Sequence, residues 1–207
     1  MNKPNPSSTI LYSADNEMES HVVRFIMAEK NIEREVVTIE DDKMPEEILE
    51  LSPSESLPTL FDRGIVLYDL SVIMEYLDER FPFPPLLPVD PIEKSEKRLL
   101  IFRFTRVAGS WFELAKTIKS GGKESAKARK ILKSSLIELV PLFEYKPFFK
   151  SDDMTIVDAC LAALLWRLKD LDIELGAQGK AVNDYGKRLF ARDSFKESLT
   201  DCEKELN

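Results

Sequence analysis

Hydrophobic and polar residues follow two different periods in the first 81 positions of the chain. Apolar residues three and four positions apart predict amphipathic helices, whereas short β-branched runs predict strands. Strands are predicted at 9–12, 33–39, 57–61 and 65–68, and helices at 20–31, 45–51 and 70–81. The order is therefore βαβα followed by ββα. The last two strands form a hairpin around Gly64, and Asp69 is expected to cap the helix that follows.

From Ile92 onward the chain shows only helical patterns. Residues 92–119 contain no proline and one internal glycine, Gly109, which predicts one long helix or a bent pair. A second long helix is predicted at 123–139, after Gly121 and Gly122. Thr155 and Asp158 fit a capping box ahead of a wide apolar stripe that ends at Leu168, and this stripe predicts the central helix of the second half. A second box at 194–197 predicts a last, charged helix that ends at Glu205.

A proline-rich stretch separates the two halves, with five prolines between Phe81 and Pro91. Proline fixes φ and lacks a backbone donor, so a helix cannot run through this stretch. The predicted organisation is a disordered lead (1–8), an α/β domain (9–81), a proline-rich linker (82–91) and an all-helical domain (92–207). Phe83 lies between Pro82 and Pro84, which predicts an outward-facing ring. The alternative is that the ring fills a gap between the two domains.

Composition places the chain among globular proteins, because 43% of its 207 residues are hydrophobic. The longest apolar run, residues 161–166, is far shorter than the roughly 20 residues of a membrane span. Residues 1–8 lack the apolar core of a signal peptide. Two cysteines, Cys160 and Cys202, do not make a disulfide framework, which predicts a reducing, cytoplasmic setting.

The net charge of −8 is spread unevenly along the chain. Residues 1–80 contain 7 basic and 18 acidic residues, and residues 81–207 contain 22 and 19. The acidity of the first half repels phosphate backbones, so we expect little direct contact with nucleic acid through it, and it attracts a basic protein surface. The alternative is that this charge only keeps the domain in solution.

The predicted order of elements, with Pro58 opening the third strand, resembles the glutathione-transferase fold. This fold has a thioredoxin-like N-terminal domain with a mixed four-stranded sheet, followed by a helical C-terminal domain. Residues 57–60, 22–30 and 155–158 carry the resemblance. It implies a cis peptide bond before Pro58 that places the backbone of Leu57 against the peptide part of glutathione.

Five further stretches resemble the stringent starvation protein A family of bacterial transcription regulators: residues 20–24, 73–82, 84–86, 164–168 and 188–195. The resemblance implies association with RNA polymerase holoenzyme and no transferase activity. It also implies a homodimer formed through helix 70–81 and the first helix of the second domain. A heterodimer with a paralogue of the same fold is the alternative to the homodimer. The residues implied to contact the σ subunit are Pro82, Phe83, Pro84, Pro85 and Leu86.

Phe83 stands where that family commonly has histidine. A contact based on shape survives this change, whereas a hydrogen bond made by the histidine side chain does not.

The competing prediction is a glutathione-dependent transferase or reductase that uses the cleft beside Pro58. Such an enzyme needs a hydroxyl or thiol near the start of the first helix, and Glu17 lies roughly there, with Tyr12 and Ser13 as nearby substitutes. It also needs an acid followed by serine at the start of helix 70–81. This chain has Asp69 and Leu70 instead. The residues of this cleft, predicted to be vestigial, are Glu17, Leu57, Pro58, Asp69 and Leu70.

The remaining candidates for chemistry are weak. His21 is the only histidine and is predicted to pack in the first helix or cap it. Cys160 is predicted to be a small core residue, and Cys202 lies on the last helix. The chain has no ligand spacing typical of a metal site and no glycine-rich phosphate loop. We therefore expect no cofactor.

Overall fold

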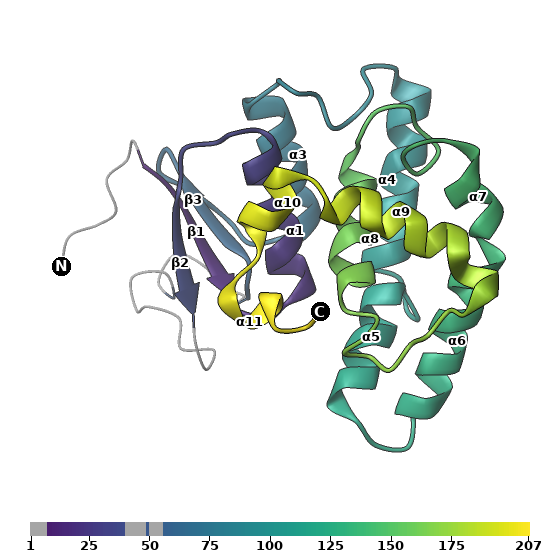
Figure 1. The fold of residues 1–207 in the computed structure, drawn as a ribbon. Coiled ribbons are helices and arrows are strands. Elements are labelled where there is room, and N and C mark those ends of the chain that lie inside the picture. The colour runs from purple at the N-terminus through teal and green to yellow at the C-terminus, as the bar shows by residue number, and fades with distance from the viewer. Residues whose placement is uncertain (1–7, 40–48, 50–55) are drawn as a thin grey trace.

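The computed structural model describes residues 8–39, 49 and 56–207, and its strands form one mixed sheet in the order β2-β1-β3-β4 (Figure 1). β1 runs parallel to β2 and antiparallel to β3, and β3 pairs antiparallel with β4. The predicted mixed four-stranded sheet is confirmed. The predicted helix 45–51 and lead 1–8 lie outside the described residues, apart from Leu49 and Ser8.

The described elements are, in chain order, β1 (Thr9–Ala14), α1 (Met18–Glu29), β2 (Glu35–Ile39), β3 (Thr59–Asp62), β4 (Ile65–Leu67), α3 (Leu70–Arg80), α4 (Pro91–Thr105), α5 (Trp111–Ser120), α6 (Ser125–Glu138), α7 (Val140–Tyr145), α8 (Ile156–Trp166), η1 (Ala177–Gly179), α9 (Lys180–Phe190), α10 (Asp193–Ser198) and α11 (Asp201–Lys204).

Each face of the sheet has its own apolar layer, because alternate residues of a strand point to opposite faces. Leu11 and Leu60 join the main core, whereas Ile10, Tyr12 and Phe61 form a small cluster on the other face. α1 and α3 lie between the sheet and the helical half of the molecule (Figure 1). Among the described elements, the helical half packs chiefly on α1, through α8 and α10.

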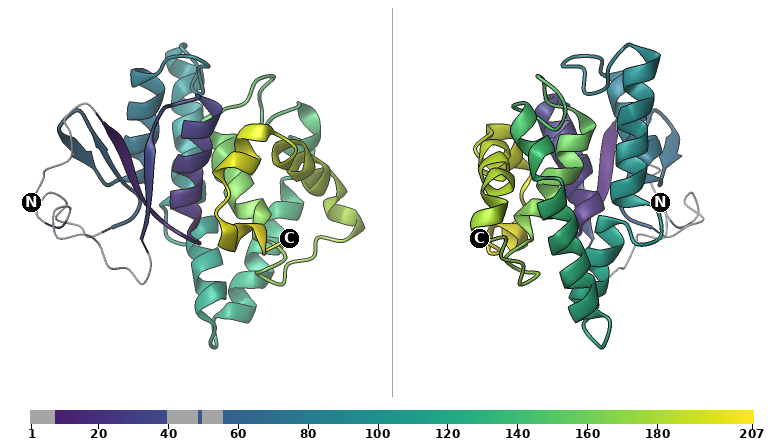
Figure 2. Two further views of the ribbon diagram at one scale, coloured as in Figure 1. Left: turned by 60° about the vertical axis from the view of Figure 1, so that its left-hand side comes forward. Right: turned by 90° about the vertical axis from the view of Figure 1, so that its right-hand side faces the viewer.

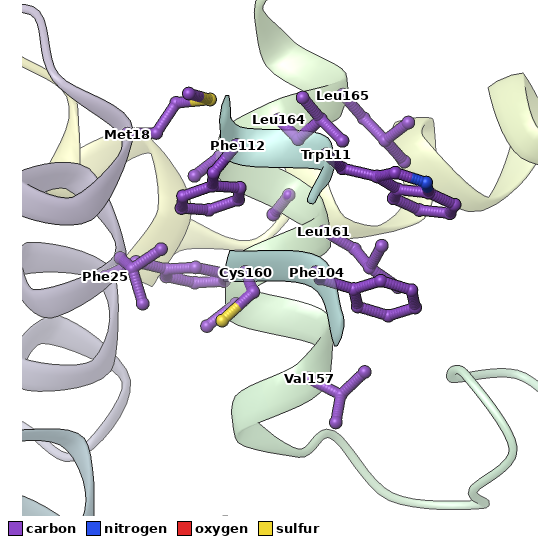
Figure 3. Packing of buried hydrophobic residues seen from close by; sticks show 14 of the residues in the cluster. Met18, Phe25, Phe104, Trp111, Phe112, Val157, Cys160, Leu161, Leu164 and Leu165 are labelled. Carbon is purple, nitrogen blue, oxygen red and sulfur yellow. The ribbon is translucent and has the colours of Figure 1, made fainter. Parts of the chain in front are cut away.

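α8 is the centre of the main core, and every residue from Ile156 to Leu165 is buried. Met18 and Phe25 of α1, together with Phe112 of α5, face α8 (Figure 3). One continuous cluster thus joins the α/β half to the helical half. None of the described helices combines the length and the apolar content that a bilayer span requires.

Two glycine-containing breaks divide the first part of the helical half. α4 ends at Thr105 and α5 begins at Trp111, so the bent-pair alternative is the correct one. Gly109 has φ +75° in the break, a value that a residue with a Cβ rarely adopts. The hydroxyl of Ser110 then caps α5 by accepting from the amide of Glu113 at 3.3 Å. α5 and α6 form a helical hairpin that extends away from the sheet (Figure 2).

The prediction of one last helix from Ser194 to Glu205 is wrong. Two short helices, α10 and α11, are separated by Leu199 and Thr200, both with extended backbones. The hydroxyl of Ser194 is engaged by the carboxylate of Glu29, so it does not cap a helix. The capping box lies further on, where the Thr200 hydroxyl accepts from the Glu203 amide and the Glu203 carboxylate accepts from the Thr200 amide, both at 3.1 Å.

Candidate functional site: the proline-rich loop and the cleft beside Pro58

The loop that connects α3 to α4 presents an aromatic ring to solvent. Pro82, Phe83, Pro84 and Pro85 are exposed, and Phe83 is 81% exposed. The ring therefore does not fill a gap between the domains, and that alternative is wrong. Leu86 is only 2% exposed. Its side chain packs into the core, so of the five residues implied to contact σ it is the one that anchors the loop.

The buried side chain of Lys30 holds the loop from below. Lys30 caps the C-terminus of α1, and its side chain has no exposed surface. Its Nζ donates to the carbonyl oxygens of Phe81 and Pro84, both at 2.7 Å, and lies 2.7 Å from Oδ1 of Asp78. These two carbonyls lie on either side of Pro82 and Phe83. The ammonium group therefore fixes both ends of the exposed tip.

Asp78 completes the attachment from the last turn of α3. Its carboxylate accepts from the backbone amides of Leu86 at 2.8 Å and Leu87 at 3.0 Å. The carbonyl of Leu86 in turn accepts from the amide of Ile156, at the start of α8, at 3.0 Å. A buried carboxylate that accepts two amides and faces an ammonium group is fully satisfied. The loop is thus fastened to α1, α3 and α8 together.

A groove with a volume of about 610 Å³ lies beside the loop. Its apolar lining includes Pro84, Pro85 and Val89 of the loop together with Phe148 and Met154. The charged residues that line it are Glu29, Glu93, Asp153 and Arg192. Because Arg192 is already paired with Glu29, the remaining charge of the groove is acidic. An apolar groove with acidic side chains suits a basic protein segment.

Glu17, at the start of α1, faces neighbouring side chains. Its Oε2 accepts from the hydroxyl of Ser20 at 2.9 Å, and the Nζ of Lys116 lies 3.8 Å from its Oε1. Lys116 also pairs with Glu19 at 2.5 Å. A carboxylate at this place repels a thiolate, so Glu17 does not stabilise the sulfur of glutathione. The two predicted substitutes, Tyr12 and Ser13, are buried, and the hydroxyl of Ser13 donates to the carbonyl of Ala14 at 3.2 Å.

Asp69, the acid predicted for the γ-glutamyl end of glutathione, caps α3. Asp69 accepts from the amides of Ser71 and Val72 at 3.0 and 3.1 Å, and its other oxygen lies 3.2 Å from Arg106. Leu70 is buried and has no hydroxyl. The peptide bond between Leu57 and Pro58 is cis, as expected, and so is the bond between Phe83 and Pro84. Pro58 is therefore the feature of the transferase cleft that this chain keeps.

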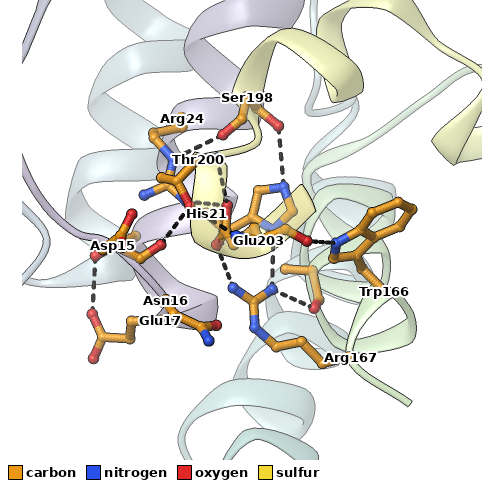
Figure 4. A network of polar contacts seen from close by, with 12 residues as sticks. Asp15, Asn16, Glu17, His21, Arg24, Trp166, Arg167, Ser198, Thr200 and Glu203 are labelled. Atoms are coloured by element: carbon orange, nitrogen blue, oxygen red, sulfur yellow. Dashed lines mark hydrogen bonds and ion pairs between the residues drawn. The ribbon is translucent and has the colours of Figure 1, made fainter. Parts of the chain in front are cut away.

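A buried network of charges joins α1 to the C-terminal segment (Figure 4). Glu203 is fully buried, and its carboxylate accepts from Arg24 at 2.6 Å and from Arg167. His21 lies between them, with Nε2 at 3.1 Å from the hydroxyl of Ser198 and Nδ1 at 3.0 Å from Arg167. Burial lowers the pKa of His21 well below its usual 6.5, and the charges of Arg167 and Arg24 lower it further. The imidazole is therefore neutral and serves a packed, structural network.

The described residues offer no metal site and no activated thiol. Within 8–39, 49 and 56–207, no three His, Cys, Asp or Glu side chains are grouped as metal ligands. Cys160 and Cys202 are both free thiols. Burial raises the pKa of Cys160, so its thiol stays protonated and is a poor nucleophile.

Two family models match the chain. The model described as "Glutathione S-transferase, N-terminal domain" matches residues 20–80, and "Glutathione S-transferase, C-terminal domain" matches residues 105–193. Among solved structures, glutathione transferase Omega 3C from Trametes versicolor superposes with a TM-score of 0.82 and 20% identity, over 96% of this chain and 92% of that one. This likeness establishes the fold.

Curated relatives are more similar in sequence. The Stringent starvation protein A homolog of Coxiella burnetii is 43% identical over 198 residues, which cover 95% of this chain and 93% of that protein. The homolog of Pasteurella multocida is 40% identical over 191 residues, which cover 91% and 89%.

Proposed function

The chain belongs to the stringent starvation protein A family, and from this premise we propose that it is a transcription regulator that binds RNA polymerase holoenzyme through the proline-rich loop. The observation that carries the proposal is the exposed ring of Phe83 on a loop fixed by the Lys30–Asp78 pair. A surface that is rigid before binding loses little conformational entropy in the complex. The contact we propose is with the σ subunit.

The groove beside the loop supports a basic partner. The acidic side chains of Glu93 and Asp153 line it next to apolar residues. A σ segment with basic and apolar side chains meets complementary charge there. The phenyl ring of Phe83 takes the place of the imidazole common in the family, so the contact at this position is apolar.

A dimer is part of the proposal. Val72 on α3 and Leu99 and Phe102 on α4 are 50%, 57% and 48% exposed, although they are apolar. Exposed apolar residues on neighbouring helices favour association with another protein surface. We assign this face to a second copy of the chain. A paralogue of the same fold is the alternative occupant.

The second candidate function is a glutathione-dependent enzyme, and the cis peptide bond before Pro58 is the observation that favours it. Against it stand the carboxylate of Glu17 and the buried Leu70, which replace the groups that handle the sulfur and the γ-glutamyl end. A peptide ligand left without a hydrogen bond at Leu70 loses about 1–3 kcal/mol. Retention on immobilised glutathione together with turnover of a chlorinated aromatic substrate would establish this function instead.

The test is co-purification with polymerase from the native cell extract. The variant Phe83→Ala/Pro84→Ala removes the exposed tip, and we expect it to lose the polymerase subunits that wild type retains. The matched control is Tyr145→Ala/Pro147→Ala, which removes an aromatic residue that is 71% exposed and a nearby exposed proline on the helical half. The control should retain polymerase, and both variants should keep the dimer mass and the melting temperature. Polymerase retained by the loop variant would mean that the loop is only a linker.

A further inference from the structure

The α5–α6 hairpin has a charge opposite to that of the rest of the molecule. Residues 111–138 contain seven lysines and arginines and three acidic residues, Glu113, Glu124 and Glu138, a net charge of +4, whereas the whole chain has a net charge of −8. The hairpin extends from the body of the protein at the end of α5 and α6 (Figures 1 and 2). The positive charge is therefore concentrated on a projecting part of the surface.

Lysines occupy the outward face of α6. The inward face is formed by Ala128, Leu132 and Leu136, which are buried. The periodicity of a helix then directs positions 127, 130 and 133 away from the core. Lys123 precedes them in the turn between α5 and α6. We call these four exposed residues the lysine stripe: Lys123, Lys127, Lys130 and Lys133.

The charge of the lysine stripe is almost uncompensated. Among the described residues, Lys123, Lys130 and Lys133 have no ion pair or hydrogen bond from their side chains. Lys127 lies 3.9 Å from Glu124, and both side chains are about three-quarters exposed, so this pair is weak. Four other exposed lysines each have an aspartate within 4 Å, three or four residues away, and two of them share Asp184: Lys180, Lys187, Lys196 and Lys204.

We propose that the lysine stripe binds the phosphate backbone of duplex DNA. The three stripe lysines within α6 span about 9 Å of its axis at about 1.5 Å per residue, and Lys123 extends the stripe into the preceding turn. Duplex DNA carries one negative charge per about 1.7 Å of its axis, so roughly five phosphates lie within the helical span. The proposal rests on the proposed function, because a regulator bound to polymerase lies next to promoter DNA. Lysine contacts to phosphate position a protein without reading sequence, so the contact is independent of the promoter.

The chemistry of α6 favours nucleic acid over an anionic membrane. A helix that binds a membrane surface needs large apolar residues beside its cations. Ala126 and Ser134, which are small or polar, lie between the lysines on the outward face. Ile131, which is 43% exposed, is the single exposed large apolar residue among the described residues of α6. The acidity that disfavours nucleic acid belongs to residues 1–80, outside the hairpin. The lysine stripe therefore offers phosphate a surface that the first half of the chain does not.

The test measures binding to a fluorescent duplex of about 30 base pairs at several salt concentrations. The variant replaces the four residues of the stripe with glutamine, which has a similar helix propensity. The matched control replaces the four paired lysines, Lys180, Lys187, Lys196 and Lys204, with glutamine and changes the net charge equally. For wild type and control we expect log K to fall with log salt concentration with a slope of about −3 to −4, since each neutralised phosphate contributes about −0.9. The stripe variant should bind at least about tenfold more weakly, with a slope near zero.

Equal binding by the stripe variant and the control would overturn the assignment, and so would a wild type without salt-dependent binding. If the stripe binds phosphatidylserine vesicles but not DNA, its partner is an anionic membrane and the DNA assignment is wrong. Nuclease treatment of the extract removes DNA that could link the protein to polymerase, so the polymerase test then no longer depends on DNA binding. Phe83→Ala/Pro84→Ala should then lose polymerase but keep DNA binding, and the stripe variant should do the opposite. If wild type fails to retain polymerase while stripe-dependent DNA binding persists, the proposed function fails and the stripe assignment stands.

Discussion

Replacing Lys30 by methionine tests whether one buried ion pair fixes the proline-rich loop. The substitution keeps most of the apolar stem and removes the ammonium group, which has a carboxylate and two carbonyl oxygens within 2.7 Å. It leaves Asp78 buried without a counter-charge. Breaking a buried pair in this way costs about 3–5 kcal/mol. A protein with a stability of about 10 kcal/mol, in the middle of the ordinary range of about 5–15 kcal/mol, remains folded after such a loss.

A double-mutant cycle measures the interaction free energy between Lys30 and Asp78 separately from the other contacts of the two side chains. Urea unfolding of Lys30→Met, Asp78→Asn and the double variant gives the coupling free energy, and we expect about 2–3 kcal/mol. The matched control is the surface pair of Arg98 and Glu75, whose side chains are 46% and 34% exposed. Glu75→Gln should cost about 1 kcal/mol or less, because solvent screens that pair.

Hydrogen exchange locates the effect in the loop. The amides of Leu86 and Leu87 donate to Asp78, so both should exchange faster in Asp78→Asn. The amide of Ile73, inside α3, donates to the carbonyl of Asp69 and should change less. A coupling free energy below about 0.5 kcal/mol, or unchanged exchange at Leu86 and Leu87, would refute the reasoning. The loop would then be held by the packing of its leucines alone.

The sheet and the central helix were predictable because their signals are local. β-branched runs, the turn at Gly64 and the apolar stripe behind Thr155 each lie within a dozen residues. Burial of α8 on all sides agrees with its nearly continuous apolar sequence. The sequence did not decide between one long helix and a bent pair at 92–119, because Gly109 is compatible with both a helix and a turn.

The anchor of the loop was missed, although its signal is present. Lys30 follows Ile26 by four positions, and Asp78 follows Met74 by four, so each charge lies on the apolar face of a predicted helix. Charged residues are rarely buried unless they are paired. Two opposite charges on buried faces therefore predict a pair. The carbonyls and amides of the loop that bond to Lys30 and Asp78 are brought there by the tertiary structure, so no sequence pattern predicts them.

The C-terminal network could not be predicted from its own segment. Glu203 lies among charged neighbours and is the one acid of residues 201–205 that is buried. Its partners, Arg24 and Arg167, are 179 and 36 positions away in the sequence. The charge pattern of 193–207 is that of an exposed helix, and only the packing against α1 selects which carboxylate is buried. The same packing breaks the predicted last helix at Leu199.

Two further predictions concern this network, and both are measured by urea unfolding. Glu203→Gln leaves the guanidinium groups of Arg24 and Arg167 buried without a counter-charge, so we expect a loss of about 3–5 kcal/mol, whereas Glu205→Gln, at an exposed position, should cost less than about 0.5 kcal/mol. His21, the only histidine, makes the stability depend on pH below its usual pKa. Because its pKa is lowered in the folded state, the unfolded chain binds a proton below about pH 6.5 while the native chain does not. The free energy of unfolding should therefore fall as the pH drops from about 6.5 to about 5.5, by up to about 1.4 kcal/mol per unit. In His21→Gln this dependence should disappear, and an unchanged slope in that variant would show that another group titrates in this range.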